Sequence, residues 1–402
     1  MPLMAAQANR PELQLLLACA RLSPDFARVQ DCASGNLDWR KVVGAAEYHG
    51  LTPLLLKNLL AADARLPEQQ MKQLEQNNAR TVRQNLLLTS ELLRAVSSLS
   101  EAGVEAVPLK GPALATRIYG DIGLRPFSDI DLLIRPEQIA AAEAVALKLG
   151  YEPEISIPAA HRDRWLKQQC ELTFRRAGVS RLEFHWDISH PHFALGTGVD
   201  DFWSRSRTVQ IGDSKLSDLS EQDLLFTLIV HGTRHGWSRL MWLVDLAELL
   251  GSLPHINWKL SAANAEERGA ARMIATALVL VRKVFDVSIE DGEMESAYAD
   301  AAAPKLANAV VEHWNQSLAR DDTSDLEPGP MWRHRWIMQT RENREQRWTY
   351  ALRVMSMVGE EEFGAARLPG AMSPLYKAMR FWNIFRKARP KTMAATSAQG
   401  KS

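Results

Sequence analysis

The stretch LRPFSDIDLLI, residues 124–134, decides how the centre of this chain is interpreted. Its last seven residues are mostly apolar and predict a β-strand. Alternate side chains of a strand point to opposite faces, so Asp129 and Asp131 are expected on one face, with Cα atoms about 6–7 Å apart. Ile130 and Leu132 then face the core.

Two carboxylates side by side repel each other, and their removal from water is costly. A hard divalent cation such as Mg²⁺ relieves both problems because it prefers oxygen ligands. The alternative is an exposed strand with two solvated acids, and the short Asp-x-Asp pattern alone leaves both interpretations open.

A phosphate-binding turn is predicted after the preceding strand, and a helix and a loop separate it from the Asp strand. Val104–Leu109 is an expected strand, and Lys110-Gly111-Pro112 leads into a helix whose first turn accommodates the proline. Exposed amides at Gly111 and the Lys110 ammonium suit a phosphate. Arg125 could hold another phosphate oxygen, and Ser128 is also expected to contact the nucleotide phosphates. A surface lysine at 110 and a loop salt bridge at 125 are the alternatives.

Composition limits the class of protein. The 402 residues carry 48 Lys+Arg against 48 Asp+Glu, and 46% are apolar. These values are typical of a globular protein and argue against a generally basic nucleic-acid binder. Cys19, Cys32 and Cys170 are too few and too scattered for a disulfide framework or a cysteine zinc site. With no apolar run of roughly 18–20 residues, a cytoplasmic protein is expected.

Helices dominate the predicted structure on both sides of the central strands. Residues 171–174 and 181–186 form a predicted hairpin that turns near Ala177-Gly178. Alternation along the second strand places Arg181, Glu183 and His185 on one face. In the long helix after Pro67, the inner face is expected to hold Val82, Leu86, Leu93 and Val96, with Leu92 beside them. Helices are predicted over about 13–20, 45–60, 67–98, 113–119, 136–149, 220–251, 258–285 and 300–318. Another helix is expected to begin at residues 37–39, with Asp38 as its cap.

The segments from Lys110 to Asp131, together with Leu182-Glu183-Phe184-His185-Trp186, resemble the uncharacterised nucleotidyltransferase family, a branch of the DNA-polymerase-β-like nucleotidyltransferase superfamily. The helical stretch from His231 to Leu246 and the ending from Leu368 to Lys387 are also similar to that family. The Lys110-Gly111-Pro112 turn departs from the Gly-Gly or Gly-Ser turn usual in the superfamily.

This resemblance implies an α+β fold, in which a small mixed β-sheet has helices on one face and helical regions on either side in the sequence. Asp129, Asp131 and Glu183 would be the catalytic, metal-binding acids, and Mg²⁺ or Mn²⁺ the cofactor. An NTP would be the donor substrate, with its triphosphate held at Gly111. The expected division is an N-terminal helical region over 1–98, the nucleotidyltransferase-like core over 99–215, a helical domain over 216–320, and a linker, C-terminal helices and basic tail over 321–402.

Several histidines are candidates for cleft residues or metal ligands. His185, His190 and His192 match no standard zinc spacing and are interpreted as hydrogen-bonded. His231 and His235 lie four apart, but the Glu of a His-Glu-x-x-His site is replaced by glycine. The residues expected at the cleft are His185, His231 and His235, with Arg239 nearby as a phosphate or acceptor contact. For His231 and His235, capping of the core is the alternative.

Two regions near the C-terminus are rich in basic residues and are candidates for surface contacts. The arginines between Arg333 and Arg347 are interpreted as a solvated helix face, diluted by acids. Residues 376–387 mix aromatic and basic side chains, which is compatible with peripheral membrane contact, although packing against the domain is favoured.

Two functions follow from these expectations. The first is a metal-dependent nucleotidyltransferase that moves a nucleoside monophosphate from an NTP to the hydroxyl of an unknown small molecule, sugar or protein. The second is a non-catalytic nucleotide-binding or polysaccharide-pathway accessory module. No stable nucleic-acid partner is expected, and a nucleic-acid-modifying enzyme is the minor alternative.

Overall fold

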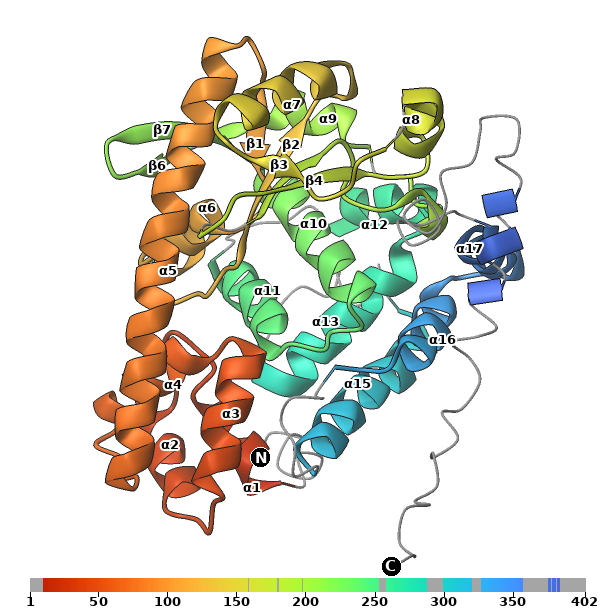
Figure 1. Ribbon diagram of the computed structural model, residues 1–402. Coiled ribbons are helices and arrows are strands. Elements are labelled where there is room, and N and C mark those ends of the chain that lie inside the picture. The colour runs from red at the N-terminus through yellow and green to blue at the C-terminus, as the bar shows by residue number, and fades with distance from the viewer. Residues whose placement is uncertain are drawn as a thin grey trace, which may run out of the picture.

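The computed structural model describes residues 10–157, 159–178, 181–196, 198–252, 258–287, 299–319 and 327–356, with short pieces at 375–376, 378–380 and 382–383 (Figure 1). The ending from Leu368 and the aromatic-basic segment at 376–387 lie largely outside these residues. Within the described residues, no helix is both long and apolar enough to cross a membrane.

Four short helices begin the described chain. Asp38 caps one of them, as the sequence predicted, because its carboxylate accepts hydrogen bonds from the backbone N–H groups of Arg40 and Lys41. Gly50 ends the same helix in a left-handed conformation. The four are α1 (Pro11–Ala18), α2 (Phe26–Ala33), α3 (Trp39–His49) and α4 (Thr52–Ala61).

The long helix α5 (Glu68–Glu101) connects these helices to the sheet and runs beside both (Figure 1). Its expected inner face was partly wrong, because Leu86 is 55% exposed whereas Leu92 is 1% exposed. The buried stripe follows Leu88, Leu92, Ala95 and Leu99, the 3.6-residue spacing of a helix. Leu86, Leu87 and Leu88 are consecutive, as are Leu92 and Leu93, so helical periodicity alone did not identify which leucines face the core.

The central sheet has five strands in the order β1-β2-β5-β4-β3. β2 and β5 are parallel, and the other neighbouring pairs are antiparallel. This mixed sheet, with helices around it, confirms the α+β expectation. The strands are β1 (Ala106–Pro108), β2 (Asp129–Ile134), β3 (Glu152–Pro153), β4 (Glu171–Arg175) and β5 (Arg181–His185).

The two faces of the sheet have different roles. Ile130 and Phe184 belong to one apolar core with Leu92 of α5 and Ala142 of α7 (Ile139–Lys148). The opposite face carries the acids of β2 and β5 and lies towards α10 (Glu221–Arg234). Between β1 and β2 the chain forms α6 (Pro112–Leu114) and then a π-helix over Ala115–Tyr119.

Several elements had no sequence prediction. They include α2, the short strand β3, the 3-10 helix Pro191–Phe193, the helices α8 (Ala159–Leu166) and α9 (Asp200–Arg205), and the two-stranded antiparallel sheet of β6 (Arg207–Ile211) and β7 (Ser214–Asp218). All of them are short. The helix predicted over 136–149 begins with a 3-10 helix at Pro136–Gln138.

The C-terminal half is helical, as expected. Ser220 caps α10, accepting a hydrogen bond from the Asp223 N–H. The single helix expected over 258–285 is two helices, because Gly269 adopts a φ of 64° between them. The elements are α11 (Leu240–Ser252), α12 (Trp258–Glu267), α13 (Ala271–Phe285), α15 (Ala303–Leu318), α16 (Pro330–Thr340) and α17 (Arg344–Ser356).

The interpretation of the arginine series as a solvated face was wrong for Arg341. This side chain is fully buried, and its Nη1 donates to the Phe193 carbonyl oxygen at 2.8 Å. The domain division stays a prediction, and its first boundary, at residue 98, falls inside α5.

We expect Leu92→Ala to lower the free energy of unfolding by about 2–5 kcal/mol, because it leaves a cavity between α5 and the sheet. Leu86→Ala is the matched control on the same helix and should change stability by less than about 0.5 kcal/mol. Urea denaturation would measure both, and equal losses would contradict the observed orientation of α5.

Candidate functional site

The parallel pairing of β2 and β5 places acids on adjacent strands. Asp131 lies directly opposite Glu183, and Asp129 lies opposite Arg181. One oxygen of Asp131, one of Glu183 and a ring nitrogen of His185 lie within 4.8 Å of one another. Residues more than 50 positions apart therefore form one polar cluster.

Lys110 lies over the two aspartates. Its Nζ is 3.4 Å from Asp129 Oδ2 and 3.2 Å from Asp131 Oδ2. Burial would lower the pKa of Lys110, but the charges of Asp131 and Asp129 outweigh it and raise the pKa above its usual value. The ammonium thus neutralises part of the acidic cluster.

His185 bridges the acids from the other side. Its Nε2 is 3.0 Å from Asp131 Oδ1 and 3.6 Å from Glu183 Oε2. Burial would raise the pKa of Asp131, yet Lys110 and His185 together hold it well below its usual range. Burial, with the charge of Asp131, raises the pKa of Glu183 despite the His185 hydrogen bond.

These residues line a cavity of about 250 Å³ between the sheet and α10. The predicted residues Lys110, Arg125, Asp129, Asp131, Glu183, His185, His231 and His235 all contribute to its wall. Gly111, the residue after Lys110, is not among the lining residues and is buried, so the expected exposed amide is not observed there. Its φ of 68° and ψ of −132° form a conformation that favours glycine. Ser128 is exposed and is not among the lining residues.

Arg125 makes the salt bridge that the sequence left as an alternative. Its Nε and Nη2 each donate to Asp245 of α11 at 2.8 Å. Tyr119 donates to Asp245 Oδ1 at 2.7 Å, so one buried carboxylate accepts three hydrogen bonds. This interaction joins the loop before β2 to α11 and orients Arg125 at the cavity.

The α10 side of the cavity carries neutral imidazoles. Burial, followed by the nearby charge of Lys110, lowers the pKa of His231 well below its usual value. Burial, followed by Arg234, lowers the pKa of His235 to about 3. Arg239 is not among the lining residues, and its guanidinium lies over the Tyr48 ring, 5.5 Å from the centroid.

The sequence interpretation missed Glu171 and Arg234, which both line the cavity. Arg234 Nη2 is 3.7 Å from Glu171 Oε2. A signal for Glu171 existed, because counting outward from the predicted turn at Gly178 pairs residue 171 with His185, the observed register. Arg234 lies three residues after His231, on the same helix face.

The donor set fits a divalent metal ion. Asp131 Oδ2 is buried without a hydrogen bond of good geometry, although Lys110 lies nearby. Mg²⁺ and Mn²⁺ prefer carboxylate oxygens, which Asp131 and Glu183 supply within 4.8 Å of each other and of a His185 nitrogen. The predicted third acid, Asp129, is outside that group and lies two residues before Asp131 on β2, opposite Arg181. Burial of the acids makes a compensating cation favourable.

The comparison with known families agrees with this geometry. The sequence model of the family described as uncharacterised nucleotidyltransferase matches residues 35–286. The chain belongs to this nucleotidyltransferase family. No curated protein and no solved structure matches the chain significantly. The match covers the long helix, the whole mixed sheet and α10 to α13, and it confirms the family suggested by the sequence.

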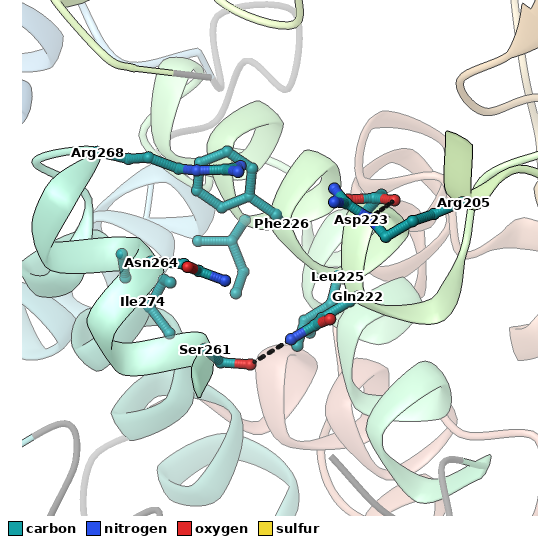
Figure 2. Close-up of a pocket in the computed structure, with 11 residues that line it drawn as sticks. Arg205, Gln222, Asp223, Leu225, Phe226, Ser261, Asn264, Arg268 and Ile274 are labelled. Atoms are coloured by element: carbon teal, nitrogen blue, oxygen red, sulfur yellow. Dashed lines mark hydrogen bonds and ion pairs between the residues drawn. The ribbon is translucent and has the colours of Figure 1, made fainter. Parts of the chain in front are cut away.

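A second cavity, of about 170 Å³, lies among α10, α12 and α13 (Figure 2). Asp223 in its wall is paired with Arg205, whose Nη2 is 2.7 Å from Asp223 Oδ1. Arg268 lies over the Phe226 ring (Figure 2). The acid in this wall, Asp223, is bound to one arginine and has no second carboxylate beside it among the lining residues, so this cavity lacks the cluster of acids that the sheet presents.

Asp245→Ala should lower the free energy of unfolding by about 3–5 kcal/mol, because it leaves the Arg125 guanidinium buried without its partner. Glu105→Ala is the control: Glu105 pairs with Arg135 at the surface, and its loss should cost about 0–1 kcal/mol. Thermal and urea denaturation of both variants would measure the difference. Similar small losses would show that the Arg125–Asp245 pair does not support the fold.

Proposed function

We propose that this protein is a metal-dependent nucleotidyltransferase that moves a nucleoside monophosphate from an NTP to an acceptor hydroxyl. The observation that carries the proposal is the β2–β5 register, which sets Asp131 opposite Glu183 with Asp129 two residues away. Family membership supports general nucleotidyl transfer. The acceptor is proposed to be a small molecule, a sugar or a protein hydroxyl.

Asp129, Asp131 and Glu183 would hold Mg²⁺ or Mn²⁺, and Gly111 and Lys110 would contact the phosphates. When bound, the metal ions activate the acceptor hydroxyl and stabilise the leaving pyrophosphate. Arg181 and Arg234 add positive charge to the cavity wall, where a polyphosphate requires it. The neutral His231 and His235 give the opposite wall a hydrogen-bonding surface without further charge.

The same geometry gives Lys110 two functions. Its ammonium now contacts the oxygens that would bind a metal ion. A cation arriving at these oxygens competes with Lys110, whose flexible chain can then turn towards a phosphate. Lys110 would thereby couple metal binding to nucleotide binding.

The accessory-module alternative is also supported by Lys110. Lys110 already neutralises Asp129 and Asp131, so its ammonium could occupy the place that a metal ion takes in an active enzyme. That module would bind nucleotide without turnover. Release of pyrophosphate from an NTP with pools of candidate acceptors would contradict it.

A cytoplasmic location remains part of the proposal, consistent with three free cysteines in the described residues.

The combined change Asp129→Asn and Asp131→Asn should abolish the gain in NTP affinity that Mg²⁺ or Mn²⁺ provides, because it removes two oxygen-ligand charges. Isothermal titration of NTP with and without metal measures this gain. A double variant at the exposed Asp163 and Asp213, each changed to Asn, has the same net charge and should keep the gain. Equal metal-assisted binding by the site variant and the wild type would disprove the proposal.

Lys110→Met should have opposite effects on the two ligands. Mn²⁺ alone should bind roughly tenfold more tightly or better, since a competing charge within 4 Å is removed, whereas the NTP should bind more weakly. Electron paramagnetic resonance of free Mn²⁺ and nucleotide titration measure the two effects. Lys72→Met, at an exposed position of α5, is the control. Weaker Mn²⁺ binding by Lys110→Met would contradict the competition between lysine and metal.

A further inference from the structure

A second group of metal-ligand side chains lies behind the acidic cluster. β4 and β5 are antiparallel, and their register places Glu171 directly opposite His185. Cys170 immediately precedes β4, and its carbonyl oxygen accepts a hydrogen bond from the Trp186 N–H at 2.9 Å. A thiol, a carboxylate and an imidazole therefore meet on two paired strands.

The spacing of the donor atoms suits one small metal ion. Cys170 Sγ is 3.6 Å from Glu171 Oε2, and His185 Nδ1 is 3.2 Å from the same oxygen. Donor atoms of these three residues all lie within 4.8 Å of one another. A tetrahedral zinc ion with ordinary bond lengths separates its ligands by roughly 3.3–3.8 Å. Small side-chain rotations would therefore complete the site.

His185 supplies the second, independent observation. The side chain is 5% exposed, and its Nδ1 makes no hydrogen bond of good geometry although Glu171 is near. Its other nitrogen, Nε2, contacts Asp131 Oδ1 at 3.0 Å. A metal-bound histidine characteristically donates its second ring N–H to a carboxylate, which fixes the ring and its tautomer. His185 has this arrangement, with Nδ1 directed towards Cys170 and Glu171.

We propose that Cys170, Glu171 and His185 bind a zinc ion, with His185 coordinating through Nδ1. A thiolate and an imidazole favour zinc over Mg²⁺, which prefers oxygen ligands. Water takes the fourth position, next to His190, whose Nε2 is 3.6 Å from Glu171 Oε1. The site does not depend on nucleotidyl transfer, and it would hold His185 in place against Asp131.

The test uses the full-length protein, freed of metal by a chelator and then titrated with Co²⁺ as a spectroscopic substitute for zinc. The wild type should develop a sulfur-to-cobalt charge-transfer band and the visible bands of tetrahedral cobalt, and Zn²⁺ should remove both. Excess Mg²⁺ should not. Cys170→Ser should lose the charge-transfer band, whereas the matched control Cys32→Ser, a second free cysteine in α2, should keep it.

Two further variants keep the test decisive if Cys170→Ser does not fold. Glu171→Gln, at a partly exposed position, should weaken cobalt binding by roughly tenfold or more. Asp163→Asn should leave it unchanged, because Asp163 is exposed on α8 and belongs to neither metal-ligand group. A wild type without the charge-transfer band, a band that persists in Cys170→Ser, unchanged binding by Glu171→Gln or loss of the band in Asp163→Asn would overturn the proposal.

Discussion

The parallel alignment of β2 with β5 is the constraint on which the rest of the site depends. It sets Asp131 beside Glu183 at a separation where like charges repel, and burial makes that repulsion more costly. The structure compensates with Lys110 on one side and His185 on the other. The sheet thus holds several carboxylates close together, in an arrangement of the kind that binds a divalent cation. Lys110 and His185 contact these carboxylates.

A second set of buried charges fixes the parts around the sheet. Asp245 of α11 accepts hydrogen bonds from Arg125 and Tyr119, which belong to the segment between β1 and β2. The C-terminal helical region is therefore bonded directly to the loop that leads into the acidic strand. Because removal of either partner would leave an unpaired buried charge, the relative position of α11 and the site is closely determined.

The sequence predicted the positions of helices and strands better than it predicted which side chains are buried between them. Alternation along β2 and β5, the Asp38 cap and the turn near Gly178 are local signals, and the structure confirms them. The inward face of α5 and the burial of Arg341 depend on what lies opposite, so the expectations for Leu86 and Arg341 were wrong. The shared helix α5 and the short strand β3 likewise depend on neighbours far away in the chain.

By itself the sequence determined the strand with its paired aspartates, the glycine turn before it, the hairpin and the family to which the chain belongs. These features can be recognised from hydrophobic periodicity, from turn residues and from a contiguous motif. Only the tertiary structure decided that Lys110 contacts both aspartates, that Arg125 belongs to Asp245, and that Cys170 meets His185. Each of these contacts joins distant segments, and its partner is chosen by strand register and helix packing rather than by spacing along the chain.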